Sequence, residues 1–223
     1  MNELAVLHDS YHTGNQMCFP VQKRLGQDTK LHHYGCGVIA MTDFCVYKNL
    51  VEKAEDSRAY MELIRHMERH YMHVLPGVGI SPYFYVFLAN RYFRARRSHY
   101  RLGRIWLWGS GEQREKRLVT KIAGQLKADF PLIFAAGPVF PGPWRYRKIP
   151  LYRLQGGHLT ESGQKVKSHY MTILGLYEDQ GQYYVKVATW GEIRYMRLRD
   201  YRKHAGCSIP FSNTVYAVRM IRK

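Results

Sequence analysis

The sequence predicts an α+β fold in which helices come first and an antiparallel sheet follows. Up to about residue 128, apolar residues recur at spacings of three and four, which is typical of amphipathic helices. From residue 131 onward, short runs rich in β-branched and aromatic residues alternate with turn residues. Such segregation favours an antiparallel sheet over an alternating α/β fold. With 223 residues, 46% of them hydrophobic, the chain suits one core, and we expect a single domain over 1–223.

The first expected helix begins in the stretch LHHYGCGVIAMTDF, residues 31–44. A polar segment, expected to be a loop, precedes Cys36, and the apolar residues after it predict a helix that is buried nearly all round. A thiol in the first helical turn faces the positive end of the helix dipole and unpaired backbone N–H groups. Cys36 is therefore either an activated nucleophile or a small buried residue at a tight turn.

Three more helices are expected in a helical insertion at about 57–128. The segment 57–75 carries one apolar stripe, made of Tyr60, Ile64, Met67, Tyr71 and Leu75. In 81–97, Ser81 suits the N-cap and Pro82 the first helical position. The face expected to be buried there consists of Phe84, Phe87, Leu88, Tyr92 and Ala95. In 109–130, Ser110 and Gln113 have capping-box spacing, and the stripe is Leu118, Ile122 and Leu126.

The sheet is expected to contain five strands, in the segments 131–137, 169–176, 182–189, 192–198 and 213–221. The stretch 137–150 is rich in Pro and Gly and is interpreted as a long surface connection. In the hairpin that starts at His169, a turn near Asp179 and Gln180 makes paired residue numbers sum to about 359, with Trp190 opposite His169. A slip of one residue brings Thr189 opposite instead. The indole would exclude water from the imidazole, or the two rings form a cross-strand pair without chemistry.

The stretches YGCGVIAM (34–41) and SHYMTILGLYEDQGQYYVKVATWGEIRYMRLRDY (168–201) resemble papain-like cysteine peptidases, and most of all their bacterial C39-like branch. The resemblance implies a papain-like fold, with the Cys36 helix as the central helix packed on a twisted antiparallel sheet. It also implies that Cys36 is the nucleophile and that His169 is its base, and later the acid that protonates the leaving amine.

Two positions depart from the family pattern. The family places an Asn or Asp before Trp-Gly to orient the histidine, whereas this chain has Ala188, and Thr189 is the candidate for that hydrogen bond. The oxyanion-hole glutamine of the family stands about six residues before the cysteine, where this chain has Lys30. We expect Gln27 to form the oxyanion hole together with Cys36, and Gln22 is a poorer candidate. Trp190 is expected to be the aromatic residue of the cleft.

The function implied by the resemblance is hydrolysis of a peptide or related amide bond, and acyl transfer to an amine would use the same Cys-His pair. A first alternative, motivated by Ala188, is a catalytically inactive papain-like binding module. A second is a basic nucleic-acid-binding protein, because the formal charge is +17 and arginines and aromatic rings interleave in 90–104. We favour the peptidase, with a peptide or protein substrate that the charge would draw when it is acidic.

No cofactor or metal is expected. The helical spacing of His66, His70 and His73 is better interpreted as a solvated cationic face than as a metal site. Four scattered cysteines, without a CxxC pair, indicate free thiols in a reducing compartment. The N-terminal MNELAVLHDS does not look like a secretion signal, and no run of apolar residues is long enough for membrane insertion. We therefore expect a cytoplasmic protein.

Overall fold

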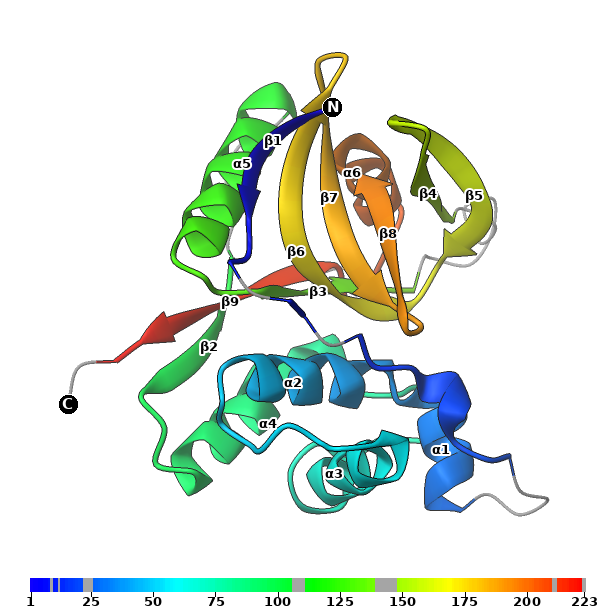
Figure 1. Cartoon of the computed structure of the whole chain (residues 1–223), viewed down its shortest axis with the longest axis vertical. Helices are drawn as coiled ribbons and strands as arrows, with labels where there is room; N and C mark the ends of the chain where they lie inside the picture. Colours follow the sequence, from blue (N-terminus) through cyan, green and yellow to red (C-terminus); the bar gives the residue numbers. More distant parts are fainter. Residues whose placement is uncertain are drawn as a thin grey trace.

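The computed structural model describes residues 1–8, 10–11, 13–21, 26–105, 111–138, 148–209 and 212–221. Within these ranges the chain forms a nine-stranded antiparallel sheet with helices packed on both faces, which confirms the predicted α+β class (Figure 1). The helices are α1 (Gln27–Tyr34), α2 (Cys36–Tyr47), α3 (Ser57–His70), α4 (Pro82–Ala95), α5 (Gly111–Lys127), α6 (Leu198–Ala205) and the short 3-10 helix η1 (Gln16–Cys18). The strands are β1 (Asn2–Val6), β2 (Tyr100–Arg104), β3 (Leu132–Ala136), β4 (Ile149–Gln155), β5 (His158–Val166), β6 (His169–Asp179), β7 (Gln182–Thr189), β8 (Glu192–Arg197) and β9 (Thr214–Met220).

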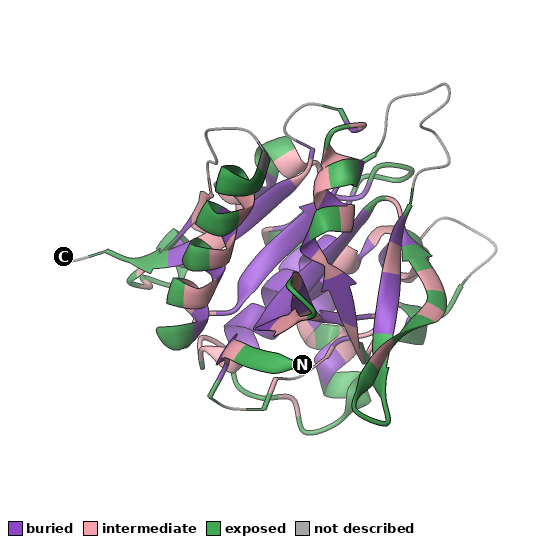
Figure 2. Cartoon of the chain, turned by 90° about the horizontal axis from the view of Figure 1, so that it is seen from above, coloured by how far each residue is buried: buried purple, intermediate pink, exposed green. Residues whose placement is uncertain are grey.

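The sheet divides the interior into two cores. Its strand order is β2-β9-β3-β6-β7-β8-β4-β5, and β1 pairs with β6. Helices α1 to α4 lie below the sheet in Figure 1, whereas α5 and α6 pack against its other face. Strand β3 is buried throughout, because Ile133 and Ala135 face the first core while Leu132, Phe134 and Ala136 face the second. Figure 2 shows the resulting band of buried residues through the central strands, with exposed residues on the outer sides of the helices.

The expected helices all form, and α2 is as apolar as predicted: ten of its residues, Gly37 to Val46, are buried. The Ser81 hydroxyl accepts a hydrogen bond from the Tyr83 N–H at 3.4 Å, so Ser81 is the N-cap of α4. The stripe of α5 is confirmed, since Leu118, Ile122 and Leu126 are buried. Ser110, the expected cap of α5, lies outside the described residues.

The predicted inner face of α4 is wrong by about one residue. Phe84 and Phe87 are 64% and 59% exposed, whereas the helix buries Tyr85, Ala89, Tyr92 and Phe93. Tyr85 accounts for this rotation, because its ring stacks on Tyr170 at 4.7 Å and its hydroxyl donates to the carbonyl of Gly37 at 2.8 Å.

The sequence analysis did not anticipate strands β1, β2, β4 and β5 or helices α1 and α6. Strand β2 lies inside 57–128, so the expected helical insertion also supplies an edge of the sheet through its pairing with β9. Residues 139–147 of the expected surface connection lie outside the described residues, and β4 follows them. No helix of the described ranges combines the length and apolarity needed to cross a membrane.

The β6–β7 hairpin has a different register from the expected one. The turn lies at Gln180 and Gly181, which both have positive φ, and Asp179 pairs with Gln182. The residue numbers of paired positions sum to 361 next to the turn. Beyond a bulge between Ile173 and Gly175 the sum is 360, as for the pair Thr172 and Ala188. The predicted sum of 359 is therefore wrong, because the turn was placed one residue too early and the bulge has no clear sequence signal.

Candidate active site

Cys36 stands at the start of α2, directly after α1. The polar stretch before it is this helix, which corrects the expected loop. Gly35 joins the two helices, and a Cβ atom there would lie 2.3 Å from the carbonyl oxygen of Leu31. A glycine before the cysteine is thus required by close backbone packing, and it lets the chain enter α2 with the thiol at the edge of the helix.

His169 begins β6 and is held from two sides. Its Nε2 atom lies 2.8 Å from the Thr189 hydroxyl, and its ring stacks on Trp190 with centroids 4.5 Å apart and planes inclined by 26°. The side chain is buried, with 7% exposure. When Nε2–H donates to Thr189, Nδ1 carries the free lone pair and becomes the basic nitrogen. The contacts expected for Thr189 and Trp190 thus form despite the difference in register.

Trp190 owes its position to the turn between β7 and β8. Trp190 and Gly191 both have positive φ, of 50° and 78°, as a tight hairpin turn requires. The Gly191 N–H donates to the Gly14 carbonyl at 3.0 Å, and a Cβ atom at 191 would lie 2.9 Å from Cβ of Asn15. The Thr13 hydroxyl donates to the Gly191 carbonyl as well. The Trp-Gly pair is therefore fixed against residues 13–15, close to the start of η1.

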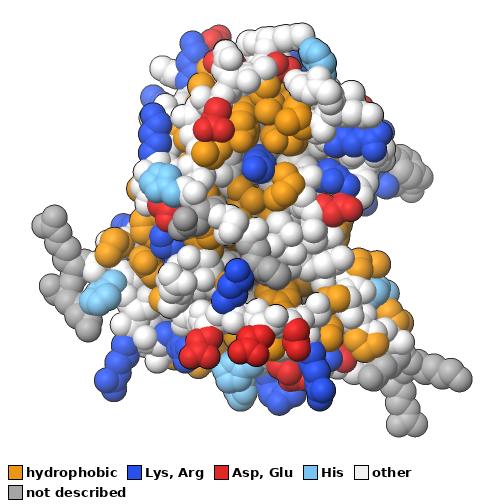
Figure 3. Space-filling view, in the orientation of Figure 1, with side chains coloured by type: hydrophobic (Ala, Val, Ile, Leu, Met, Phe, Trp, Pro, Cys, Tyr) orange, Lys and Arg blue, Asp and Glu red, His pale blue; other side chains and the backbone are white. Residues whose placement is uncertain are grey.

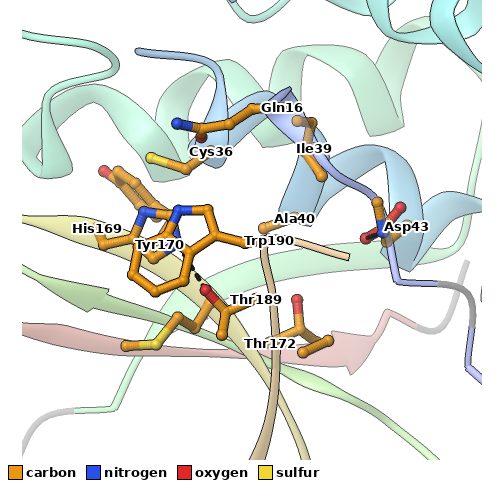
Figure 4. A pocket seen from close by; sticks show the side chains of 13 residues that line it. Gln16, Cys36, Ile39, Ala40, Asp43, His169, Tyr170, Thr172, Thr189 and Trp190 are labelled. Atoms are coloured by element: carbon orange, nitrogen blue, oxygen red, sulfur yellow. Dashed lines mark hydrogen bonds between the residues drawn. The ribbon is translucent and has the colours of Figure 1, made fainter. Parts of the chain in front are cut away.

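Gln16 is the site residue that the sequence analysis missed. It lines the same pocket as Cys36, His169 and Thr189, and Figure 4 shows its side-chain amide next to Cys36. Its Oε1 is buried and has no hydrogen-bond partner within the described part of the chain. Gln16 lies 20 positions before Cys36 because α1 intervenes, so the spacing of the family pattern does not find it.

Gln27, the expected oxyanion-hole residue, is placed elsewhere. Its amide nitrogen donates to Oε2 of Glu68 at 2.7 Å and to the Arg65 carbonyl at 2.9 Å, and its amide oxygen accepts from Arg69. Because Gln27 starts α1, the segment after it is helical and does not bulge toward Cys36. Lys30 pairs with Glu68 as well, at 3.2 Å. Gln22 lies outside the described residues.

Asp43 is a buried carboxyl group at the inner end of the pocket. Its Oδ2 accepts the Gly14 N–H at 2.9 Å, and its Oδ1 accepts the Tyr60 hydroxyl. Burial raises the pKa of Asp43 to about 7, although both hydrogen bonds favour the carboxylate. Asp43 therefore connects α2 to the same N-terminal segment that carries Gln16.

Burial also controls the two reacting groups. Burial raises the pKa of the Cys36 thiol. The backbone N–H groups of Tyr170, Gly37 and Cys36 itself have the opposite, smaller effect, because they favour the thiolate. Burial lowers the pKa of His169 to about 3. Both groups are consequently neutral near pH 7. Proton transfer from the thiol to the imidazole keeps the net charge of the pocket at zero, and Gln16 and the backbone N–H groups are the dipoles next to the charges so formed.

The pocket is small, with a volume of about 20 Å³, which is enough for one water-sized group. No group of three or more His, Cys, Asp or Glu side chains is placed to hold a metal ion among the described residues. The rings of His66 and His70 lie 4.5 Å apart on α3. Comparisons of the chain with protein-family models, curated proteins and solved structures found no match.

Proposed function

We propose that the protein is a papain-like cysteine hydrolase that cleaves a peptide or related amide bond through Cys36 and His169. The observation that carries the proposal is the convergence of four groups from distant segments: a thiol at a helix start, a histidine hydrogen-bonded to Thr189, a stacked Trp190 and the amide of Gln16. Nucleophilic thiol catalysis requires the same set: a nucleophile, an oriented base and a donor for the oxyanion.

The proposed reaction begins when Nδ1 of His169 accepts the thiol proton as Sγ attacks the carbonyl carbon. The oxyanion of the tetrahedral intermediate accepts hydrogen bonds from the Gln16 amide and the Cys36 N–H. The imidazolium then donates its proton to the amine nitrogen as the C–N bond breaks. The amine departs, and the acyl group remains bound to sulfur as a thioester. Water, deprotonated by His169, hydrolyses this thioester and restores the thiol; an amine in place of water gives acyl transfer.

Thr189 replaces the Asn or Asp of the family as a neutral hydrogen-bond partner of Nε2. A hydroxyl group is a weaker orienting partner than a carboxylate, because it adds no charge to stabilise the imidazolium. Trp190 compensates in part, since its ring covers the imidazole and restricts its rotation. We therefore expect a slow enzyme whose histidine is held mainly by packing.

The decisive test is the rate at which iodoacetamide alkylates each cysteine as a function of pH, read by mass spectrometry. In the wild type we expect Cys36 to react faster than the exposed Cys18 below about pH 8, because His169 accepts the thiol proton while the sulfur–carbon bond forms. In His169→Ala this advantage should vanish, because the buried thiol has lost its proton acceptor. Equal reactivity of Cys36 and Cys18 in the wild type would overturn the proposal.

Turnover is tested separately, by incubating the protein with a mixture of peptides and detecting new amino termini. We expect cleavage by the wild type and by Cys18→Ala, and none by Cys36→Ala. Cleavage by Cys36→Ala at the wild-type rate would assign the activity to another site or to a contaminant. A reactive Cys36 without any turnover would favour the binding module of the same fold.

A further inference from the structure

A second site lies on the outer side of α4, away from the catalytic pocket. It is an open groove of about 670 Å³ between α4 and the edge strand β2. Tyr83, Phe87, Asn90 and Arg94 line it at positions i, i+4, i+7 and i+11, which is one continuous stripe of the helix. Tyr85, on the opposite side of α4, donates its hydroxyl to the carbonyl of Gly37 in α2, and the described residues that line the Cys36 pocket include none from α4.

The groove is positively charged, and its described lining residues include no carboxylate. Arg94, Arg101 and Arg104 line it, and the sequence contains no Asp or Glu between residues 69 and 111 or after Asp200. Arg101 also stands directly opposite Arg219 in the β2–β9 pair. Like charges in facing positions destabilise a sheet, so an anionic ligand next to this pair of arginines would reduce their repulsion. Arg94, Arg101 and Arg219 form no ion pair within the described structure.

Aromatic rings stand beside these cations. Tyr83 and Phe87 are 47% and 59% exposed, although rings of this size are normally buried. On the face drawn in Figure 3, by contrast, carboxylates gather over the connection between α2 and α3, away from β2. Arginines for phosphates and open ring faces for bases are the combination that binds single-stranded nucleic acid without strict sequence preference.

The edge of β2 is closed to an incoming peptide strand at its middle. The Asn90 side chain donates to the Leu102 carbonyl at 2.9 Å and accepts the Leu102 N–H at 2.8 Å, so both backbone groups are satisfied. A peptide that added a strand to this edge would have to displace Asn90. An occupant that binds through charge and stacking needs no backbone groups of β2.

We infer that the groove between α4 and β2 binds single-stranded nucleic acid, with Arg94 and Arg101 on phosphates and Phe87 stacked on a base. This function is independent of the hydrolase activity and uses none of its residues. It gives a role to Tyr83 and Phe87, two of the three exposed aromatic rings of α4; the third, Phe84, lies outside the groove.

The test is fluorescence anisotropy of the full chain with labelled oligothymidylate and oligouridylate of about ten nucleotides, at low and moderate salt. Arg94→Gln/Arg101→Gln should weaken binding at least tenfold and reduce the slope of log K against log salt by roughly 1.4, about 0.7 for each phosphate contact. The matched control, Arg153→Gln/Arg199→Gln, removes the same charge from exposed arginines of β4 and α6 and should change affinity less than threefold.

A second pair of variants isolates stacking. Phe87→Ala should weaken binding roughly tenfold, whereas Phe84→Ala, which removes an equally exposed ring of the same helix outside the groove, should leave it unchanged. Thermal melting of each variant confirms that it is folded. Equal losses in the two arginine pairs would assign binding to net charge and overturn the inference. Absence of binding, or equal competition by a glutamate-rich peptide, would overturn it as well.

Discussion

The pocket of Cys36 and the groove are lined by different elements and have opposite physical properties. The N-terminal segment, α2, β6 and β7 line the pocket, whereas α4 and β2 line the groove. The pocket has a volume of about 20 Å³, and its titratable groups are buried. The groove has about 670 Å³ and presents arginines and aromatic rings to solvent. In the pocket, desolvation decides which groups are charged; in the groove, the charges are permanent and solvent ions screen them.

This difference indicates how one helix can serve both sites. The inner side of α4 supports the start of α2 through Tyr85, which requires a fixed, dry contact. Its outer side carries no such constraint, and exposed residues there are free to change charge and shape without disturbing Cys36. The two sites should therefore respond to different variables, namely proton transfer in the pocket and ionic strength in the groove.

The largest expected effect distinguishes the proposed oxyanion donor, Gln16, from Gln27, which the sequence analysis expected in that role. Gln16→Ala should lower the rate of hydrolysis about 10²- to 10³-fold, because the oxyanion loses a preorganised donor. Alkylation of Cys36 forms no oxyanion and should change little. The matched control is Gln27→Ala, whose amide is bound to Glu68 and Arg65, and it should keep nearly full activity. If Gln27→Ala lowered the rate of hydrolysis more than Gln16→Ala, the oxyanion donor would be Gln27.

The next effect compares the two sites in salt. Between about 50 and 200 mM NaCl, binding of oligothymidylate should fall roughly tenfold, because each phosphate contact releases counterions. Cleavage of an uncharged peptide should change less than twofold over the same range, since buried groups are poorly screened. A saturating amount of oligothymidylate should also leave Cys36 alkylation unaffected. Loss of both activities in parallel would mean that the sites are one continuous surface.

The predictable part of this molecule is the part governed by local signals. An apolar run predicts the Cys36 helix, and Ser81 and Pro82 predict the start of α4. The existence of both helices therefore follows from local propensity and capping. The contacts of His169 with Trp190 and Thr189 could also be predicted, because the partners in a hairpin are close in sequence. The two registers considered differ by one residue, and they place either Trp190 or Thr189 opposite His169.

The unpredicted part depends on tertiary contacts. Gln16 reaches Cys36 only because Gly14 is bound to Asp43 and Gly191, which are distant in the chain. The face that α4 buries is decided by the stacking of Tyr85 on Tyr170, whereas the sequence pattern predicted that Phe84 and Phe87 would be buried. Short strands such as β2 gain most of their stability from a partner, here β9, that lies more than a hundred residues away.

A smaller effect on the rate of hydrolysis is expected from Thr189, the hydrogen-bond partner of His169. Thr189→Val keeps the shape of the side chain but removes the partner of His169 Nε2, and it should lower kcat roughly tenfold. Thr189→Ser should restore most of the activity, because it retains the hydroxyl. A purely structural role would give the opposite ranking, with Val tolerated better than Ser at a buried position.

The last prediction concerns stability against pH and uses two buried groups with opposite shifts. The pKa of His169 is about 3 in the folded chain and about 6.5 in the unfolded chain, so between these values only the unfolded chain binds the proton. This contribution makes stability rise with pH. The pKa of Asp43 is about 7 folded and about 3.9 unfolded, so the folded chain retains a proton that the unfolded chain loses, and stability falls as pH rises.

In the wild type these two slopes, each at most about 1.4 kcal/mol per pH unit, oppose one another between about pH 4 and pH 6.5. Asp43→Asn, which mimics the neutral acid, should leave only the contribution of His169, so that stability rises with pH. His169→Gln should leave only the contribution of Asp43, so that stability falls with pH. Urea unfolding at several pH values measures both, as the difference between each variant and the wild type. Difference curves that are flat with pH would mean that the pocket admits enough water to keep both groups near their ordinary pKa values, and the contrast between a dry pocket and a wet groove would then no longer hold.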